Sequence, residues 1–157
     1  SRTLAENIAL GGTNAEIEDI KEAAGTASLL ETIENFKEGF ETTVGERGFT
    51  LSGGQKQRTA IARMIIGKSP IMVFDDSLSA VDAETDAKIR KGLMEKGKDS
   101  TVIIISHRIT TLMAADNILV LDKGRLVESG THDELIKNTG IYRKIYDIQS
   151  VALNYEE

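Results

Sequence analysis

The most informative stretch of this chain is Leu51-Ser52-Gly53-Gly54-Gln55-Lys56-Gln57-Arg58. It begins a segment that the residue pattern predicts to be a helix from Ser52 to about Ile66, which Gly67 and Pro70 end. Ser52 can cap this helix, and two glycines in the first turn leave backbone N–H groups open to an anion. A Ser-Gly-Gly sequence by itself is more typical of an ordinary capped helix than of a phosphate site.

A short apolar run, Ile71 to Phe74, ends in the acidic pair Asp75-Asp76. The run predicts a strand that is buried on both faces, as in a parallel sheet. A carboxylate after such a strand lies at the carboxyl edge of the sheet, where α/β proteins bind ligands. Because Mg²⁺ is usually held by one or two carboxylates together with water and phosphate oxygens, Asp75 is a candidate magnesium ligand. The alternative interpretation of Asp75 is a helix cap or a turn residue.

The other segments predict a helical first third followed by alternating strands and helices. Thr13 and Glu16 have the spacing of a capping box, and Thr131 and Glu134 have the same spacing. A second buried strand at 101–105 is followed by Ser106-His107-Arg108. The other expected elements are helices at 82–96 and 109–115, a hairpin with strands at 117–121 and 125–128, and a weakly amphipathic tail at 141–153.

The composition narrows the classes of function. The chain has 157 residues, a net charge of −6, 4% aromatic residues and no cysteine. This balance argues against a nucleic-acid binder, and the lack of cysteine excludes disulfides and thiolate metal sites. No apolar run reaches the roughly 18 residues that span a bilayer. The chain begins without methionine inside an amphipathic pattern, so we expect a fragment.

One pattern only imitates a phosphate loop, which has the form G-x-x-x-x-G-K-[ST] between a strand and a helix. Gly67-Lys68-Ser69 supplies the last three positions, but the first glycine would fall on Ala62. Residues 63–66 belong to the expected helix interior, where the amides that a phosphate cradle needs are already bonded. We therefore interpret Lys68 as a cation near a helix C-terminus.

Taken whole, the octapeptide at 51–58 resembles the signature motif of ABC-transporter ATP-binding domains. The segment before it, Thr43-Val44-Gly45-Glu46-Arg47-Gly48, resembles the X-loop of ABC exporters. The strand that ends at Asp75 resembles Walker B, Ser79-Ala80-Val81-Asp82 resembles the D-loop, and His107 resembles the switch histidine. The resemblance covers essentially the whole chain but only the C-terminal portion of the family domain, and it lacks Walker A.

The resemblance implies two groups of nucleotide-binding residues. In the family, ATP lies between two domains arranged head to tail, and the signature of one domain meets the phosphates held by the other. Ser52, Gly53 and Gly54 would contact the γ-phosphate held by a partner. Three further residues are expected to contribute to nucleotide binding across the dimer interface, namely Gln55, Ser79 and Asp82. A plain helix N-cap is the alternative for Asp82, and both roles can hold together.

Asp75, Asp76 and His107 would serve the nucleotide of this chain's own site. The resemblance implies that Asp75 binds Mg²⁺ and that His107 contacts the γ-phosphate. At position 76 the family pattern has Glu, acting on the attacking water, whereas this chain has the shorter Asp76. A misplacement of about 1 Å can cost on the order of 100-fold in rate, so we expect a degenerate site; a slow but working base is the alternative. His132 lies at an expected helix start and is interpreted as structural or merely exposed.

The implied fold is α/β, a partial P-loop NTPase-like parallel sheet with an α-helical signature subdomain. The expected division is a helical signature-subdomain portion at 1–67 and a RecA-like α/β core portion at 68–157, which ends in the hairpin and C-terminal helices. Without Walker A the isolated fragment is expected to be inactive.

The implied function is ATP binding and hydrolysis that drive transmembrane export, with ATP and Mg²⁺ as cofactors. The expected partners are a second ATP-binding domain, identical or different, and the transmembrane domain of the transporter; nucleic acid is not expected. The expected location is the cytoplasmic face of the cell membrane. Two alternatives stay open: a non-transport ABC ATPase of DNA repair or translation, and a non-enzymatic nucleotide-sensing or dimerisation module.

Overall fold

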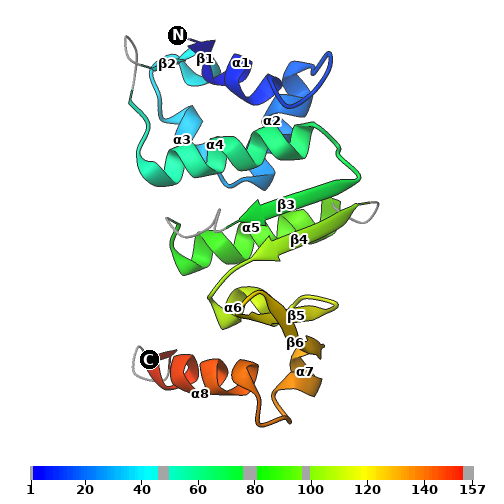
Figure 1. The fold of residues 1–157 in the computed structure, drawn as a ribbon. Helices are drawn as coiled ribbons and strands as arrows, with labels where there is room; N and C mark the ends of the chain where they lie inside the picture. Colours follow the sequence, from blue (N-terminus) through cyan, green and yellow to red (C-terminus); the bar gives the residue numbers. More distant parts are fainter. Residues whose placement is uncertain (1, 46–49, 76–80, 97–99, 154–157) are drawn as a thin grey trace. The chain divides into compact units, whose positions relative to one another are not determined.

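The computed structural model describes residues 2–45, 50–75, 81–96 and 100–153. The chain forms two compact units, Ser1–Ile105 and Ser106–Glu157, and each is described by itself (Figure 1). The first unit combines a helical layer with a small parallel sheet, and the second combines a hairpin with short and long helices. This mixed composition confirms the predicted α/β class.

The helical layer of the first unit is built around α4 (Gly53–Ile66). Helices α1 (Leu4–Ala9) and α2 (Ile17–Thr26) both pack on α4, side by side in Figure 1. The remaining elements are short: β1 (Arg2–Thr3) pairs antiparallel with β2 (Thr43–Val44), and α3 (Leu30–Glu34) and the 3-10 turn η1 (Gly39–Glu41) lie between them in the sequence. Leu4, Ile8, Ala24, Ile33 and Ile61 form the centre of this layer, each at most 1% exposed.

The capping box predicted near the N-terminus of the chain is not the one that the structure shows. α1 is capped by Thr3, whose N–H donates to Glu6 at 2.9 Å. The predicted box of Thr13 and Glu16 is wrong, because α2 begins only after Glu16, which is itself the N-cap. The Glu16 N–H donates to Asp19 Oδ2 at 3.2 Å, so a neighbouring pair with the same spacing does the capping.

A parallel pair of strands forms the sheet of the first unit. β3 (Ile71–Asp75) runs beside β4 (Thr101–Ile105), with Ile71 opposite Thr101 and Asp75 opposite Ile105. α5 (Ala83–Lys96) is the helix of the connection between them. Both strands and the helix confirm the sequence prediction to within one residue.

The prediction that β3 is buried on both faces, however, is wrong. Met72 and Phe74 are buried in the core that also contains Ile61 of α4 and Ile89 of α5. Ile71 and Val73 point to the opposite face and are 61% and 50% exposed. Helices of the described part of this unit cover one face of the strand, so its burial alternates with a period of two.

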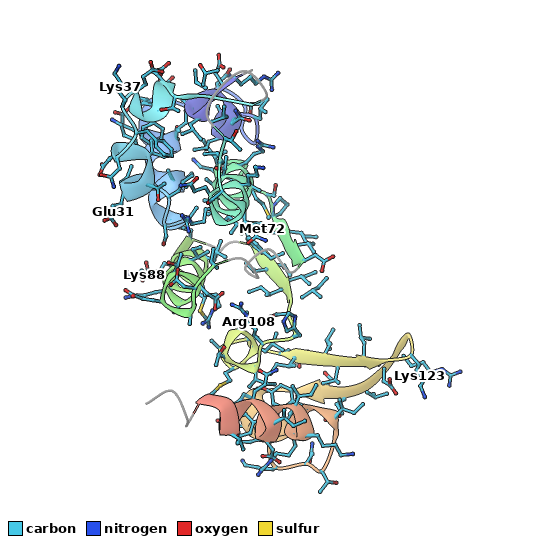
Figure 2. The ribbon with its side chains drawn as sticks, turned by 90° about the vertical axis from the view of Figure 1, so that its left-hand side faces the viewer. Glu31, Lys37, Met72, Lys88, Arg108 and Lys123 are labelled. Carbon is cyan, nitrogen blue, oxygen red and sulfur yellow. The ribbon has the colours of Figure 1, made fainter. Side chains whose placement is uncertain are left out.

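The second unit is a hairpin packed with helices. β5 (Ile118–Asp122) and β6 (Arg125–Gly130) pair antiparallel, and the turn residues Lys123 and Gly124 have φ angles of 48° and 75°. Lys123 stands at the tip of the hairpin in Figure 2. Two positive φ angles are the geometry of the tight hairpin turn that the Asp-Lys-Gly sequence indicates.

The helices of this unit close its small core. They are α6 (Ile109–Leu112), α7 (His132–Leu135) and α8 (Ile141–Leu153). The predicted capping box at Thr131 and Glu134 is confirmed at the start of α7. The core consists of four buried side chains: Ile109, Ile118, Leu135 and Tyr142. Within the described ranges, every helix of the chain is too short or too polar to cross a membrane.

Among the described glycines, Gly11 lies closest to the backbone of another element. A Cβ atom there would come within 1.6 Å of the Arg63 carbonyl oxygen of α4, whereas a Cβ atom on Gly25 of α2 would meet nothing within 4 Å. We expect Gly11→Ala to lower the free energy of unfolding by about 1–3 kcal/mol, because α1 and α4 must separate. The matched change Gly25→Ala should raise it by about 0.5–1 kcal/mol through helix propensity. Chemical denaturation followed by circular dichroism measures both, and equal effects would contradict the close approach.

Candidate functional site

The start of α4 is fixed by a reciprocal capping box. Ser52, the N-cap, has extended backbone angles, φ −63° and ψ 166°. Its hydroxyl accepts from the Gln55 N–H at 3.3 Å, and its own N–H donates to the Gln55 side-chain oxygen at 2.9 Å. The Lys56 N–H donates to the Ser52 carbonyl at 2.9 Å, which closes the first turn of the helix. Ser52 and Gln55 therefore hold the turn that carries both glycines.

The capping box does not use the backbone N–H groups of Gly53 and Gly54. Among the described residues, neither amide has a backbone or side-chain acceptor. Gly53 is exposed, and a Cβ atom on it would have no neighbour within 4 Å. The N-terminus of a helix carries a partial positive charge and open N–H groups, which together favour an anion. This geometry can accept a phosphate that approaches from outside the unit.

The body of α4 is anchored while its start stays open. The Thr59 hydroxyl donates to the Gln55 carbonyl at 2.8 Å, and Thr59 is buried. Arg63 Nε donates to the Asn7 carbonyl of α1 at 2.8 Å, and its Nη2 donates to Asn7 Oδ1 at 3.3 Å. These bonds and the packing of Ile61 fix the direction in which the helix start points.

Asp75 ends β3 with an exposed side chain at the carboxyl edge of the sheet. Among the described residues, no group of three or more His, Asp or Glu side chains could hold a metal ion by itself. A single carboxylate suits Mg²⁺ that is held mainly by phosphate and water oxygens, so Asp75 fits the proposed ion. Asp76 and Ser79 lie outside the described residues.

Asp82 caps α5. Its Oδ1 accepts from the Thr85 N–H at 2.9 Å, and its carbonyl accepts from the Asp86 N–H at 2.9 Å. The bond from the Thr85 backbone, followed by that from the Thr85 hydroxyl, holds the pKa of the Asp82 carboxyl below its ordinary value. The plain N-cap interpretation of Asp82 is therefore confirmed, and capping leaves a further role at an interface open.

His107 belongs to the second unit, in the segment between β4 and α6, and its side chain is exposed. The His107 carbonyl accepts from Gln149 Nε2 of α8 at 2.7 Å, and the Arg108 N–H donates to Ser106 Oγ at 3.1 Å. Asp75 and His107 thus lie in different units. No sequence motif marks Gln149, so sequence analysis missed its contact with His107.

His132 has a structural contact. Its Nδ1 lies 2.8 Å from the Tyr142 hydroxyl, and the two rings meet edge to face with centroids 5.8 Å apart. Tyr142 is buried, and burial, followed by the charge of Tyr146, raises the pKa of its hydroxyl. His132 therefore joins α7 to α8, which fits its interpretation as a structural residue.

Gly67-Lys68-Ser69 does not form a phosphate loop. α4 is helical through Ile66, and Gly67 is its C-cap. The Lys68 N–H donates back to the Ile65 carbonyl at 3.1 Å, and Lys68 Nζ lies 3.9 Å from Asp19 Oδ1. The Lys68 N–H is therefore bonded within the C-terminal end of the helix, as the sequence predicts.

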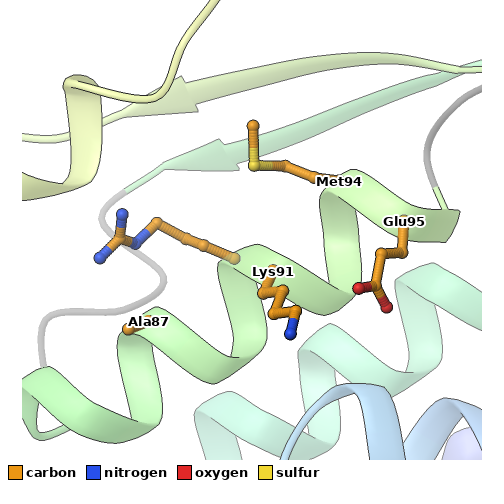
Figure 3. Close-up of a pocket in the computed structure, with 5 residues that line it drawn as sticks. Ala87, Lys91, Met94 and Glu95 are labelled. Carbon is orange, nitrogen blue, oxygen red and sulfur yellow. The ribbon is translucent and has the colours of Figure 1, made fainter.

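A shallow groove on α5 does not include the candidate residues. It is lined by Ala87, Arg90, Lys91, Met94 and Glu95, four of which are labelled in Figure 3. None of the residues predicted to bind nucleotide lines it. The candidate site therefore consists of the exposed start of α4 and the end of β3.

The family model for ABC transporters matches residues 2–79, which include the capped start of α4 and Asp75. The chain belongs to the ABC transporter family. It is 43% identical over 151 residues to the candidate multidrug export ATP-binding/permease protein YgaD of Bacillus subtilis, covering 96% of this chain and 26% of YgaD. It is 44% identical, with the same two coverages, to a candidate multidrug export ATP-binding/permease protein of Staphylococcus aureus strain NCTC 8325.

A solved structure extends the similarity to the fold. The chain superimposes with a TM-score of 0.87 on a bacterial Atm1-family ABC exporter with ATP bound, at 39% identity, covering 94% of this chain and 26% of that one. The predicted resemblance to an exporter-type ATP-binding domain is confirmed. This ABC transporter chain spans about a quarter of the length of the relatives it matches, 26% in each case.

The cap at Asp82 generates a prediction for the dependence of stability on pH. Because the folded pKa lies below that of an unfolded Asp, about 3.9, the cap contributes full stability above that pH and loses it as the pH falls through the folded pKa. We expect Asp82→Asn, which keeps an acceptor for the Thr85 N–H, to reduce the loss of stability between pH 5 and pH 2. Urea denaturation across this range measures the difference, and parallel curves for the two proteins would contradict the assignment.

Proposed function

We propose that the chain is part of the ATP-binding domain of an ABC exporter, and that the start of α4 completes the ATP site of a second such domain. The observation that carries this proposal is the exposed first turn of α4, in which a Ser52–Gln55 capping box presents two glycine amides that no described residue accepts from. The similarity to multidrug export ATP-binding/permease proteins supports the exporter type.

The glycine pair suits phosphate recognition across an interface. A phosphate needs several donors within hydrogen-bond distance, and a side chain at the helix tip would hold it away. The exposed Gly53 adds no bulk, and the Ser52 hydroxyl lies beside the open amides as a further ligand. The contribution is electrostatic and pre-organised, because the capping box fixes these donors before a phosphate arrives.

The chain's own site would use the end of β3 and the segment after β4. Mg²⁺, when bound, neutralises charge on the phosphates of ATP. Asp75 would hold this ion, His107 would bond the γ-phosphate, and Asp76 would face the attacking water. Asp76 is one methylene shorter than the Glu of the family pattern, so its carboxylate would orient the water poorly. The domain would therefore complete the partner's site better than it runs its own.

The remaining parts of the proposal concern the intact protein. The partner domain lies head to tail against this one, and a transmembrane domain of the same transporter receives the motion of closure at the cytoplasmic face of the membrane. The division into a helical portion at 1–67 and a RecA-like core portion at 68–157 belongs to the same proposal. Without a Walker A loop, the isolated chain would not hydrolyse ATP. A nucleotide-sensing module is the second candidate, and Asp76 is the residue that favours it.

A charge placed at Gly53 tests the signature role. Gly53→Asp adds a carboxylate where nothing lies within 4 Å, so the fold of the chain should be unaffected or slightly stabilised by the helix dipole. We expect phosphate release by the complete transporter to fall by about 100-fold, because the carboxylate repels the partner's phosphates. Gly53→Asn is the matched neutral control: it adds the same bulk without the charge, and it should lose less than Gly53→Asp. Equal losses for Asp and Asn would argue against an anion at this position.

A change at Asp76 tests the degenerate site and the enzymatic function. In the complete polypeptide that contains this chain, we expect Asp76→Glu to raise phosphate release by on the order of 10- to 100-fold, because the longer side chain reaches the attacking water. Asp76→Asn, which has the same length but no charge, should give no increase. An unchanged rate in Asp76→Glu would show that position 76 does not limit hydrolysis.

A further inference from the structure

The side chain of Gln149 in α8 bonds to the backbone on both sides of Arg108. Its Nε2 donates to the His107 carbonyl at 2.7 Å, and its Oε1 accepts from the Ile109 N–H at 2.9 Å. The two bonds span 42 and 40 positions of sequence and join the C-terminal helix to the segment that follows β4. One side chain thus holds the two peptide groups that flank this turn of the backbone.

A carboxamide can make this pair of bonds because it carries a donor and an acceptor side by side. The Ile109 N–H can only donate and the His107 carbonyl can only accept, so the amide of Gln149 has one possible orientation. A carboxylate would keep the bond to Ile109 but would place an anionic oxygen against the His107 carbonyl. Because the planar amide matches two backbone groups at once, it restrains the position of the segment more than either bond alone would.

The neighbourhood makes this restraint effective. Ile109 is 3% exposed and packs in the core of the second unit with Tyr142 of α8. Gln149 is half-buried, and its bond to the Ile109 N–H is partly buried, whereas its bond to the His107 carbonyl is exposed. The Arg108 N–H is held by Ser106 Oγ at 3.1 Å. Each residue from 106 to 109 therefore takes part in a hydrogen bond or in core packing, whereas the His107 side chain stays exposed.

We propose that Gln149 is a positioning residue for His107: α8 fixes the backbone of the switch histidine so that the imidazole meets the terminal phosphate of ATP. This inference rests on the proposed role of His107. Ile109 is also the first residue of α6, so Gln149 could merely cap that helix. The two roles differ in one respect, since a positioning role acts on the γ-phosphate alone and a capping role acts on the stability of the whole unit.

The test compares binding of a hydrolysis-resistant ATP analogue with binding of ADP in the complete polypeptide. We expect His107→Ala and Gln149→Ala each to weaken triphosphate binding, by about tenfold for the first and about threefold to tenfold for the second, with ADP binding unchanged. Gln149→Glu should behave like Gln149→Ala, because it cannot donate to the His107 carbonyl. Unchanged ADP affinity also shows that each variant is folded.

Ser150→Ala is the matched control on the same helix, because among the described residues the Ser150 hydroxyl bonds to the Asp147 carbonyl within α8 and to no residue outside that helix. It should bind both nucleotides as the unchanged protein does. If His107→Ala selectively weakens triphosphate binding and Gln149→Ala does not, or weakens both nucleotides equally, the positioning role is wrong while the role of His107 stands. If His107→Ala leaves the ratio of affinities unchanged, the role of His107 is wrong and this proposal goes with it.

Discussion

The backbone amides at the start of α4 impose the constraint around which the first unit is organised. A helix start has four N–H groups without partners inside the helix. The capping box satisfies two of them, those of Ser52 and Gln55, and leaves those of the two glycines without an acceptor among the described residues. Exposed donors are useful to a ligand only if they do not move. The buried side of α4 packs in the core and is bonded to α1 through Arg63. These contacts hold the helix start in place, so the exposed donors depend on the packing of the helix.

Sequence patterns predicted the elements with strong local signals. The cap at Ser52, the Thr131 box and the strands predicted at 71–74 and 101–105 are found where they were expected, although the first strand extends one residue further, to Asp75. The box at Thr13 failed because Glu16 and Asp19 have the same spacing one turn later, and spacing alone cannot rank two adjacent pairs. Burial of β3 on both faces failed because an apolar run reports the chemistry of a strand but not how many layers cover it.

In the candidate site, too, local features could be predicted from the sequence and contacts between distant residues could not. Contiguous residues such as Ser52 to Gln55 can be assigned from a motif, because the motif and the capping geometry occupy the same four positions. The bonds of Arg63 to Asn7 and of Gln149 to His107 join residues 56 and 42 positions apart. Neither has a local pattern, since a side chain that bonds to a distant backbone group is chosen by three-dimensional position and not by its neighbours in sequence.

The residues proposed for the partner's ATP site and those proposed for the chain's own site belong to different segments of the chain. The donors of α4 are set by a capping box within α4 and by packing on α1, and both are formed by residues that precede β3 in the sequence. In the proposed function, the shorter side chain at position 76 therefore changes the chain's own site and not the helix start. Electrostatic recognition by fixed amides tolerates such a change, whereas alignment of a water molecule for attack does not, because it depends on about 1 Å of reach. A domain of this construction can give up its own hydrolysis and still serve the site of its partner.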